Sequence, residues 1–237
     1  PLRVYQWDSE ANTDFPEKRE DNFHQNIQFC VSEGDVQIAY SSIGKGFPIL
    51  KAPNWLNHIE YEVRSPLWSP FLKSFSEKYE LIRFDQRGNG LSDWEVEEIS
   101  EDSMITDMRA VVDSTNINNF AIFGMSQGCA FAIRYAAEYP EQVKCLILFG
   151  GYILGRLKRN TDEDKNRHEI GMKMIESGWG SNSPIYRNFF TSSFLPDASK
   201  RESDSFDELQ RVCTNTVNAM RIHEMNSNVD VTKYAKR

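Results

Sequence analysis

The chain has 237 residues, of which 40% are hydrophobic and 26% are charged, a composition typical of a single globular domain. Its net charge of −8 argues against a nucleic-acid surface, because phosphate binding requires clustered Lys and Arg side chains. No apolar run approaches the roughly 18 residues of a membrane span. No signal peptide is visible at the N-terminus, and the first residue is Pro1 rather than Met.

The cysteines are far apart in the sequence and form no C-x-x-C pair. We therefore expect neither a disulfide framework nor a metal site, and the sequence implies no organic cofactor. We interpret the four side chains as buried thiols in a reducing compartment, with the cytoplasm as the expected location. They are Cys30, Cys129, Cys145 and Cys213.

Residues 1–22 are charged and contain proline, which is typical of a linker or of the tail of a preceding domain. Two short segments follow, 27–31 and 36–40, in which apolar and polar residues alternate. The intervening Glu33-Gly34-Asp35 is a turn signal, so the pair predicts a β-hairpin. A third strand is expected at 47–50.

The sequence then alternates between helix and strand signals. Ser65-Pro66 and Ser100 are typical helix starts, and Pro140 follows a helix end. This alternation predicts an α/β fold whose sheet is mostly parallel, with an antiparallel first hairpin. In chain order we expect a helix at 65–78, a strand at 80–84, a helix at 100–115, a strand at 119–123, a helix at 127–138 and a strand at 143–149.

Residues 155–230 contain no clear strand signal and read as helices, in particular 162–177 and 203–226. We expect a core at 23–154, a helical lid at 155–230 and the start of a return to the core at 231–237. The lid contains five aromatic residues that we expect to lie between its helices. These are Trp179, Tyr186, Phe189, Phe190 and Phe194.

The segment Gly124-Met125-Ser126-Gln127-Gly128 matches G-x-S-x-G, a pattern that chance would produce in roughly one chain in ten of this length. Its context makes it informative, because it joins a predicted strand to a predicted helix. A serine nucleophile presented on such a sharp turn has strained backbone angles and needs small neighbours. The alternative is that Ser126 only caps the helix. We interpret Ser126 as a nucleophile.

A second segment, Asp85-Gln86-Arg87-Gly88-Asn89-Gly90-Leu91-Ser92, follows the predicted strand at 80–84. This segment and the sharp turn at Ser126, called the elbow below, both occur in the α/β-hydrolase superfamily. Residues 24–155 resemble that superfamily, and the helical region resembles its lid. The resemblance implies an α/β-hydrolase fold and a serine hydrolase that cleaves an ester or related acyl bond through an acyl-serine intermediate. Asp85 and Arg87 could be taken for catalytic groups, but we expect them to have a structural role in holding this loop.

The resemblance further implies two backbone N–H groups that stabilise the oxyanion of the reaction. One is the N–H of Gln127. The other comes from the loop after the third strand, where Pro53-Asn54 replaces the common His-Gly. Because proline has no N–H, we expect Trp55 to supply the second donor, with Asn54 as the alternative.

In the superfamily the acid and the histidine of the triad follow the lid. Neither is present before Arg237, so we expect the chain to be part of a longer polypeptide. A pseudo-hydrolase that binds ligand without turnover is the alternative. Of the histidines, only His58 is expected near the oxyanion loop, and we expect lid histidines on a solvated face. The four are His24, His58, His168 and His223.

The segment 53–61, together with Ser65-Pro66-Leu67-Trp68, resembles a narrower subgroup, the α/β-hydrolase domains fused to class III nucleotidyl cyclases or helix-turn-helix regulators. This resemblance implies a second function, a ligand-sensing module that controls an attached domain. As partners we expect a small apolar acyl or ester substrate, no nucleic acid on this segment and no membrane. Self-association is expected through an uncovered edge of strand 143–149.

Overall fold

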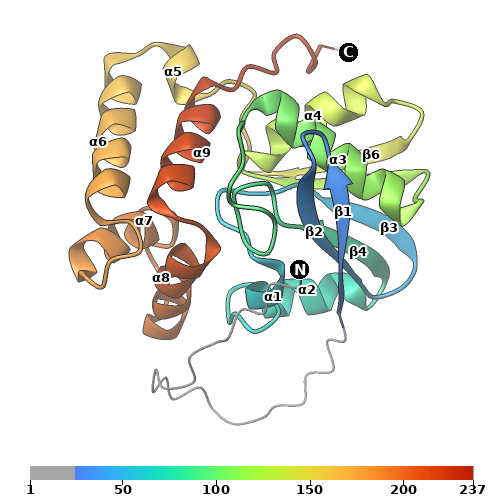
Figure 1. The fold of residues 1–237 in the computed structure, drawn as a ribbon, viewed down its shortest axis with the longest axis horizontal. Helices are drawn as coiled ribbons and strands as arrows, with labels where there is room; N and C mark the ends of the chain where they lie inside the picture. Colours follow the sequence, from blue (N-terminus) through green and yellow to red (C-terminus); the bar gives the residue numbers. More distant parts are fainter. Residues whose placement is uncertain (1–24, 237) are drawn as a thin grey trace.

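The computed structural model describes residues 25–236, so the predicted linker at 1–22 lies outside the described residues. Its centre is a six-stranded sheet with the strand order β1-β2-β4-β3-β5-β6. Figure 1 shows this sheet with a group of helices, α5 to α9, gathered at one side of it. The strands are β1 (Asn26–Ser32), β2 (Val36–Ile43), β3 (Phe47–Lys51), β4 (Tyr79–Phe84), β5 (Phe120–Met125) and β6 (Val143–Phe149).

The sheet is mixed, as the sequence predicts. β1 pairs with β2 in an antiparallel hairpin whose turn contains Gly34 and Asp35, at φ 80° and 58°. β2 also pairs antiparallel with β4, whereas β4, β3, β5 and β6 run parallel. The carboxyl ends of the parallel strands therefore meet at one edge, which is where ligands bind in sheets of this kind.

Four helices belong to the sheet region: α1 (Ile59–Glu62), α2 (Ser69–Ser76), α3 (Glu101–Thr115) and α4 (Gly128–Glu138). α3 begins as predicted, because Ser100 and Ser103 form a capping box. The predicted start of α2 was wrong. α2 begins only at Ser69, although the Ser65 hydroxyl still accepts from the Leu67 N–H at 3.3 Å and also lies 2.9 Å from the hydroxyl of Ser205 in the lid.

Apolar side chains fill the space on both faces of the sheet. Successive strand residues point to opposite faces, so Leu50 enters the core beside α3 and α4 while Ile49 enters the core beside α2. In β5, Ile122 likewise enters the core beside α3 and α4, and Ala121 enters the core beside α2. Each fully buried aliphatic side chain of this size contributes about 1.5–3 kcal/mol to stability. The two cores hold β3, β4 and β5 in place, and with them the edge of the sheet at which their carboxyl ends meet.

The helical region begins and ends at neighbouring points, because Leu154 and Asp230 form an isolated antiparallel bridge. The region that the sequence assigns to the lid contains α5 (Arg156–Arg159), α6 (Asp162–Gly178), α7 (Pro184–Phe194), α8 (Lys200–Cys213) and α9 (Thr216–Asn228). None of the helices within residues 25–236 is long and apolar enough to cross a membrane.

The prediction of one helix over 203–226 was wrong, because the chain is extended at Thr214, with φ −166° and ψ 166°. Two tertiary contacts hold this break. The Thr214 hydroxyl donates to the carbonyl oxygen of Gly88 at 2.5 Å, and its carbonyl accepts from the Trp179 indole at 3.0 Å. Asn215 then caps α9 by accepting from the Asn218 N–H at 2.9 Å.

β6 forms one edge of the described sheet. Ile147, Leu148 and Phe149 are 40%, 47% and 65% exposed. Because adjacent residues of a strand point to opposite faces, both faces of β6 are uncovered at this end. Cys145 is exposed on the same strand, so the expectation of four buried thiols was wrong for this residue and holds for the other three.

Candidate active site

Ser126 lies between the end of β5 and the start of α4. Its φ of 53° is in the left-handed region, where a non-glycine residue costs about 1–3 kcal/mol. Its N–H donates to the carbonyl oxygen of Phe149 in β6 at 3.0 Å, which holds the turn against the neighbouring strand. The residue in the cap position of α4 is Gln127, and no side chain caps this helix. Ser126 therefore has the backbone of a strained elbow and does not act as a helix cap.

The two glycines of the motif allow this close turn. A Cβ at Gly124 would lie 2.8 Å from the Cα of Cys129 and from the carbonyl oxygen of Gly128. A Cβ at Gly128 would lie 3.0 Å from the carbonyl oxygen of Pro53. The first contact keeps strand and helix together, and the second places the loop after β3 directly against the start of α4.

This loop, residues 52–58, leaves the sheet after the Ala52 N–H donates to the Phe123 carbonyl oxygen at 2.9 Å. Within residues 25–236, the N–H groups of Trp55 and Gln127 donate no hydrogen bond. The Asn54 N–H is also free within this part of the chain. Unpaired backbone donors beside a serine hydroxyl are what an oxyanion site requires.

The side chain of Gln127 connects the elbow to the lid. It is 1% exposed, and its amide nitrogen donates to the Gln86 side-chain oxygen at 3.3 Å. Asn226 of α9 donates to its amide oxygen. Two buried atoms of these side chains, Gln86 Nε2 and Asn226 Oδ1, have no hydrogen-bond partner in the part of the chain that the structure describes.

The ring of Trp55 lies beneath the helical region. Its centroid is 5.9 Å from that of Trp179, 6.0 Å from Phe190 and 5.6 Å from His223. Phe190 is buried, whereas Phe194, also predicted to lie between helices, is 51% exposed. Two of the five predicted aromatic residues, Trp179 and Phe190, therefore cover the oxyanion loop as well as packing against each other.

The histidines do not all lie where the sequence placed them. His58 caps α1, with its Nδ1 accepting from the Tyr61 N–H at 3.4 Å. The expectation of a solvated face for the lid histidines was wrong. His168 is 9% exposed and its ring stacks on that of His223 at 5.2 Å, and His223 in turn contacts Trp55. His24 lies outside the described residues.

The Ser126 hydroxyl has no hydrogen-bond partner in the described part of the chain, so none of His58, His168 and His223 is in place as its base. His168 is instead bound to α9, where its Nδ1 lies 3.0 Å from the Ser227 hydroxyl and its Nε2 3.0 Å from the Glu224 carboxylate. Among residues 25–236, no group of three or more His, Cys, Asp or Glu side chains could hold a metal ion.

Asp85 lies at the carboxyl end of β4 and holds two loops together. Its carboxylate accepts from the N–H of Ile59 at 2.9 Å, from the Asn57 side chain at 2.8 Å and from the N–H of Leu91 at 2.8 Å. Burial raises the pKa of Asp85 to about 6, although the nearby His58 acts in the opposite direction. Both carboxylate oxygens of Asp85 therefore hold loops in place, which is a structural role.

Arg87 has the same kind of role two residues later. Its guanidinium forms a two-pronged ion pair with Asp107 of α3, with distances of 2.7 and 3.0 Å. Both side chains are almost fully buried. The pair fixes the segment 85–92 against α3.

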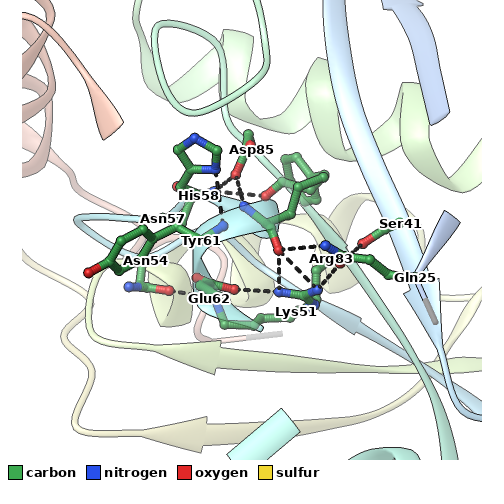
Figure 2. A network of polar contacts seen from close by, with 12 residues as sticks. Gln25, Ser41, Lys51, Asn54, Asn57, His58, Tyr61, Glu62, Arg83 and Asp85 are labelled. Carbon is green, nitrogen blue, oxygen red and sulfur yellow. Dashed lines mark hydrogen bonds and ion pairs between the residues drawn. The ribbon is translucent and has the colours of Figure 1, made fainter. Parts of the chain in front are cut away.

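A further buried group was missed by sequence analysis. Figure 2 shows Lys51, Glu62 and Arg83 joined beneath the oxyanion loop, with Asn54 bound to Lys51. Each of the three charged side chains is at most 3% exposed. No sequence pattern signals the group, because its members come from β3, α1 and β4, which are separate in the chain.

Comparison with known proteins agrees with this geometry. Residues 60–223 match the family described as the alpha/beta hydrolase fold. The chain belongs to the α/β-hydrolase family.

Relatives of this α/β-hydrolase include the pyrrolizixenacetamide deacetylase of Xenorhabdus hominickii, 23% identical over 211 residues that span 87% of this chain and 75% of the relative. The AB hydrolase superfamily protein YisY of Bacillus subtilis is 28% identical over 193 residues, 72% of this chain and 68% of the relative.

Two solved structures share the fold. The bromoperoxidase from Bacillus anthracis has a TM-score of 0.71 at 18% identity, covering 88% of this chain and 76% of that one. The esterase EaEST from Exiguobacterium antarcticum has a TM-score of 0.69 at 20% identity, covering 87% and 75%. At these identities the likeness concerns the fold alone.

The close approach at Gly124 gives a stability prediction. Gly124→Ala should lower the free energy of unfolding by about 2 kcal/mol, because its Cβ would meet backbone atoms that cannot move independently. As a control, Gly150→Ala has open space around its Cβ but a φ of 58°, and should cost about 1 kcal/mol. Urea unfolding measures both, and a Gly124→Ala protein as stable as the Gly150→Ala protein would contradict the packing argument.

The half-buried His223 gives a pH prediction. Burial, and after it the neighbouring His168, lower the pKa of His223 to about 4, whereas an unfolded histidine titrates near 6.5. The unfolded state therefore binds the proton first, and the stability that His223 contributes above pH 6.5 is lost as the pH falls toward 4. The loss is about 3 kcal/mol in total.

We expect His223→Phe to lack this loss, so the stability difference between wild type and variant should change by about 3 kcal/mol between pH 7 and pH 4. The comparison cancels the contribution of Asp85, whose raised pKa stabilises the fold as the pH falls from 6 to 4. Chemical unfolding at several pH values provides the measurement. A pH-independent difference would show that His223 is hydrated and titrates normally.

Proposed function

We propose that this α/β-hydrolase cleaves an ester or amide bond through an acyl-serine intermediate formed on Ser126. The observation that carries the proposal is the strained turn at Ser126, with φ 53°, next to a loop whose Trp55 N–H is unpaired. The Ser126 hydroxyl attacks the carbonyl carbon, and the N–H groups of Gln127 and Trp55 stabilise the negative charge on its oxygen. The Asn54 N–H is the alternative second donor.

The relatives support this reaction class. One curated relative is called a deacetylase, and a structure with the same fold is called an esterase. Both reactions pass through a tetrahedral oxyanion after attack on a carbonyl carbon. For the acyl group we propose a small apolar substituent, because Trp55 lies among Trp179 and Phe190.

The reaction also needs a catalytic base that accepts the proton of the Ser126 hydroxyl. A serine hydroxyl is a weak nucleophile until a neighbouring imidazole accepts its proton, and Ser126 has no such partner within residues 25–236. We propose that sequence beyond Arg237 provides a further strand within about ten residues, then an Asp or Glu, and then a His after one more strand. The uncovered edge of β6 supports an additional strand at this position.

The absence of a base among residues 25–236 also favours a second candidate, a ligand-sensing module without turnover. The resemblance of 53–61 to hydrolase domains attached to cyclases or helix-turn-helix regulators supports this alternative. In that function the aromatic residues around Trp55 would contact the signal, and the bound state would be transmitted to the attached domain.

A reducing, cytoplasmic location is part of the proposal. Within the described residues all four cysteines are free, and three of them are buried. Free buried thiols are usual where glutathione and thioredoxin keep cysteines reduced.

Covalent labelling tests the reaction. The polypeptide extended along its gene past Arg237 should react with a fluorophosphonate at Ser126, and Ser126→Ala should abolish labelling. The 237-residue chain should be nearly inactive toward a short activated aryl ester, because triad members act as a unit. Extended protein that has the His but is not labelled would favour the sensing module, and an extension without such a His would overturn the proposed mechanism.

Self-association tests the edge of β6. We propose that the 237-residue chain associates through this edge, and that Leu148→Lys weakens the association by placing a charge on it. The matched control is Ile185→Lys, which changes a 70% exposed isoleucine of α7, a helix on the opposite side of the molecule from β6 in Figure 1. Light scattering provides the measurement, and a monodisperse wild-type monomer would contradict the proposal.

A further inference from the structure

The cluster of buried charges beneath the oxyanion loop has no part in the chemistry described so far. Lys51, Glu62, Arg83 and Asp85 are each at most 3% exposed. Removing charges from water is costly, and apolar residues in their place often leave a protein equally stable or more stable. Stability is therefore a weak reason for two cations and two anions to occupy this position.

The contacts of Lys51 lead directly to the oxyanion loop. Lys51 is the last residue of β3, and its ammonium group donates to the Asn54 side-chain oxygen at 2.5 Å. The amide nitrogen of Asn54 donates in turn to the carbonyl oxygen of Leu56 at 2.8 Å. These two bonds bracket Trp55, whose N–H belongs to the peptide unit that starts at Asn54.

Burial lowers the pKa of Lys51, whereas the carboxylates of Glu62 and Asp85 act in the opposite direction and favour its charged form. As an ammonium group, Lys51 also decides which way the Asn54 amide faces. An ammonium group can only donate hydrogen bonds, so the oxygen of Asn54 must face Lys51. Its nitrogen must then face Leu56, where it finds a carbonyl oxygen. A neutral side chain at 51 would leave both orientations open, and the loop would lose the charge-assisted bond, which is among the stronger hydrogen bonds in proteins.

The far side of the loop is tied to the same charges. Glu62, at the end of α1, has one carboxylate oxygen 3.6 Å from the Lys51 ammonium and the other 2.7 Å from the Arg83 guanidinium. Arg83 also donates to the carbonyl oxygen of Ile59 at 3.4 Å, and to the side chain of Gln25 at 2.6 Å. Both ends of the loop are thus fixed by one buried network, as Figure 2 shows.

The loop needs such an anchor because its own backbone forms few hydrogen bonds. Pro53 has no N–H, and the N–H groups of Asn54 and Trp55 are unpaired within residues 25–236. A donor that is free for an oxyanion cannot hold its own loop in place. Side-chain contacts must do so instead.

We propose that Lys51 and Asn54 are positioning residues that set the direction of the Trp55 N–H, with Glu62 and Arg83 holding Lys51 in place. The proposal rests on the function proposed for Ser126, since it concerns the oxyanion donor of that reaction. Neither residue touches the reacting atoms. They act through the backbone between Lys51 and Leu56.

Two measurements on the full polypeptide test this. Asn54→Ala keeps all four charges and removes only the bridge to the loop. Hydrogen exchange within segment 52–58, read at the bonded Ala52 N–H and at the N–H groups of the buried Leu56 and Asn57, should become about tenfold faster, with the strands unchanged. The rate of Ser126 phosphonylation by a fluorophosphonate at saturation should fall about ten- to a hundredfold, with the half-saturating concentration unchanged. Lys51→Met should change both quantities in the same direction.

The control is Arg134→Met, which removes a partly buried cation bound to Glu101, Asp102 and Glu138 on the outer side of α3 and α4. It should leave exchange at 52–58 and the labelling rate unaltered. Unchanged exchange at 52–58 in Asn54→Ala overturns the proposal. Faster exchange with an unaltered labelling rate overturns it as well, because anchoring of the loop would then not determine the direction of the Trp55 N–H.

The exchange measurement does not depend on activity. If the wild-type polypeptide is not labelled, the function proposed for Ser126 has failed, and exchange at 52–58 still decides whether Lys51 and Asn54 anchor the loop. If Lys51→Met does not fold, Asn54→Ala alone decides, because it leaves the charges paired.

Discussion

The turn at Ser126 is the constraint around which the rest of the site is arranged. β5 must pass into α4 within two residues, and the chain does so with Ser126 at φ 53° and its N–H bound to the Phe149 carbonyl oxygen. The strain of such a residue persists only where its surroundings leave no other conformation. Gly124 and Gly128 permit the contacts that impose it, and the parallel strands on either side of β5 hold the turn in place.

The same turn also restricts the path of the loop after β3. Gly128 lies against the carbonyl oxygens of Ala52 and Pro53, so the loop must follow a fixed path past the start of α4 while keeping its N–H groups free. A loop with free N–H groups cannot rely on a backbone ladder. The structure resolves this conflict with buried side chains, Lys51 bound to Asn54 on one side and Asp85 bound to Ile59 on the other. Burying these charges costs folding stability, and in return it fixes the path of the loop.

The helical region is joined to the elbow by direct contacts. Asn226 of α9 binds Gln127, the residue after the nucleophile, and His223 one turn earlier packs against Trp55. A displacement of α9 would therefore alter the surroundings of both proposed oxyanion donors. The lowered pKa of the half-buried His223 makes the packing of α9 sensitive to acid, since protonation would place a charge between His168 and Trp55.

The sequence by itself determined the strands, the helices α3 and α4 and the turn at Ser126, because each depends on residues close together in the chain, whereas it predicted neither α1 nor the start of α2. The spacing of Gly124, Ser126 and Gly128 between a strand and a helix is one such local signal. Tertiary structure decided the rest. The break at Thr214 depends on Gly88 and Trp179, the burial of His168 depends on α9, and the network at Lys51 joins three distant segments. Local propensity cannot encode these contacts, because their partners meet only after the sheet has formed and the helices have packed against it.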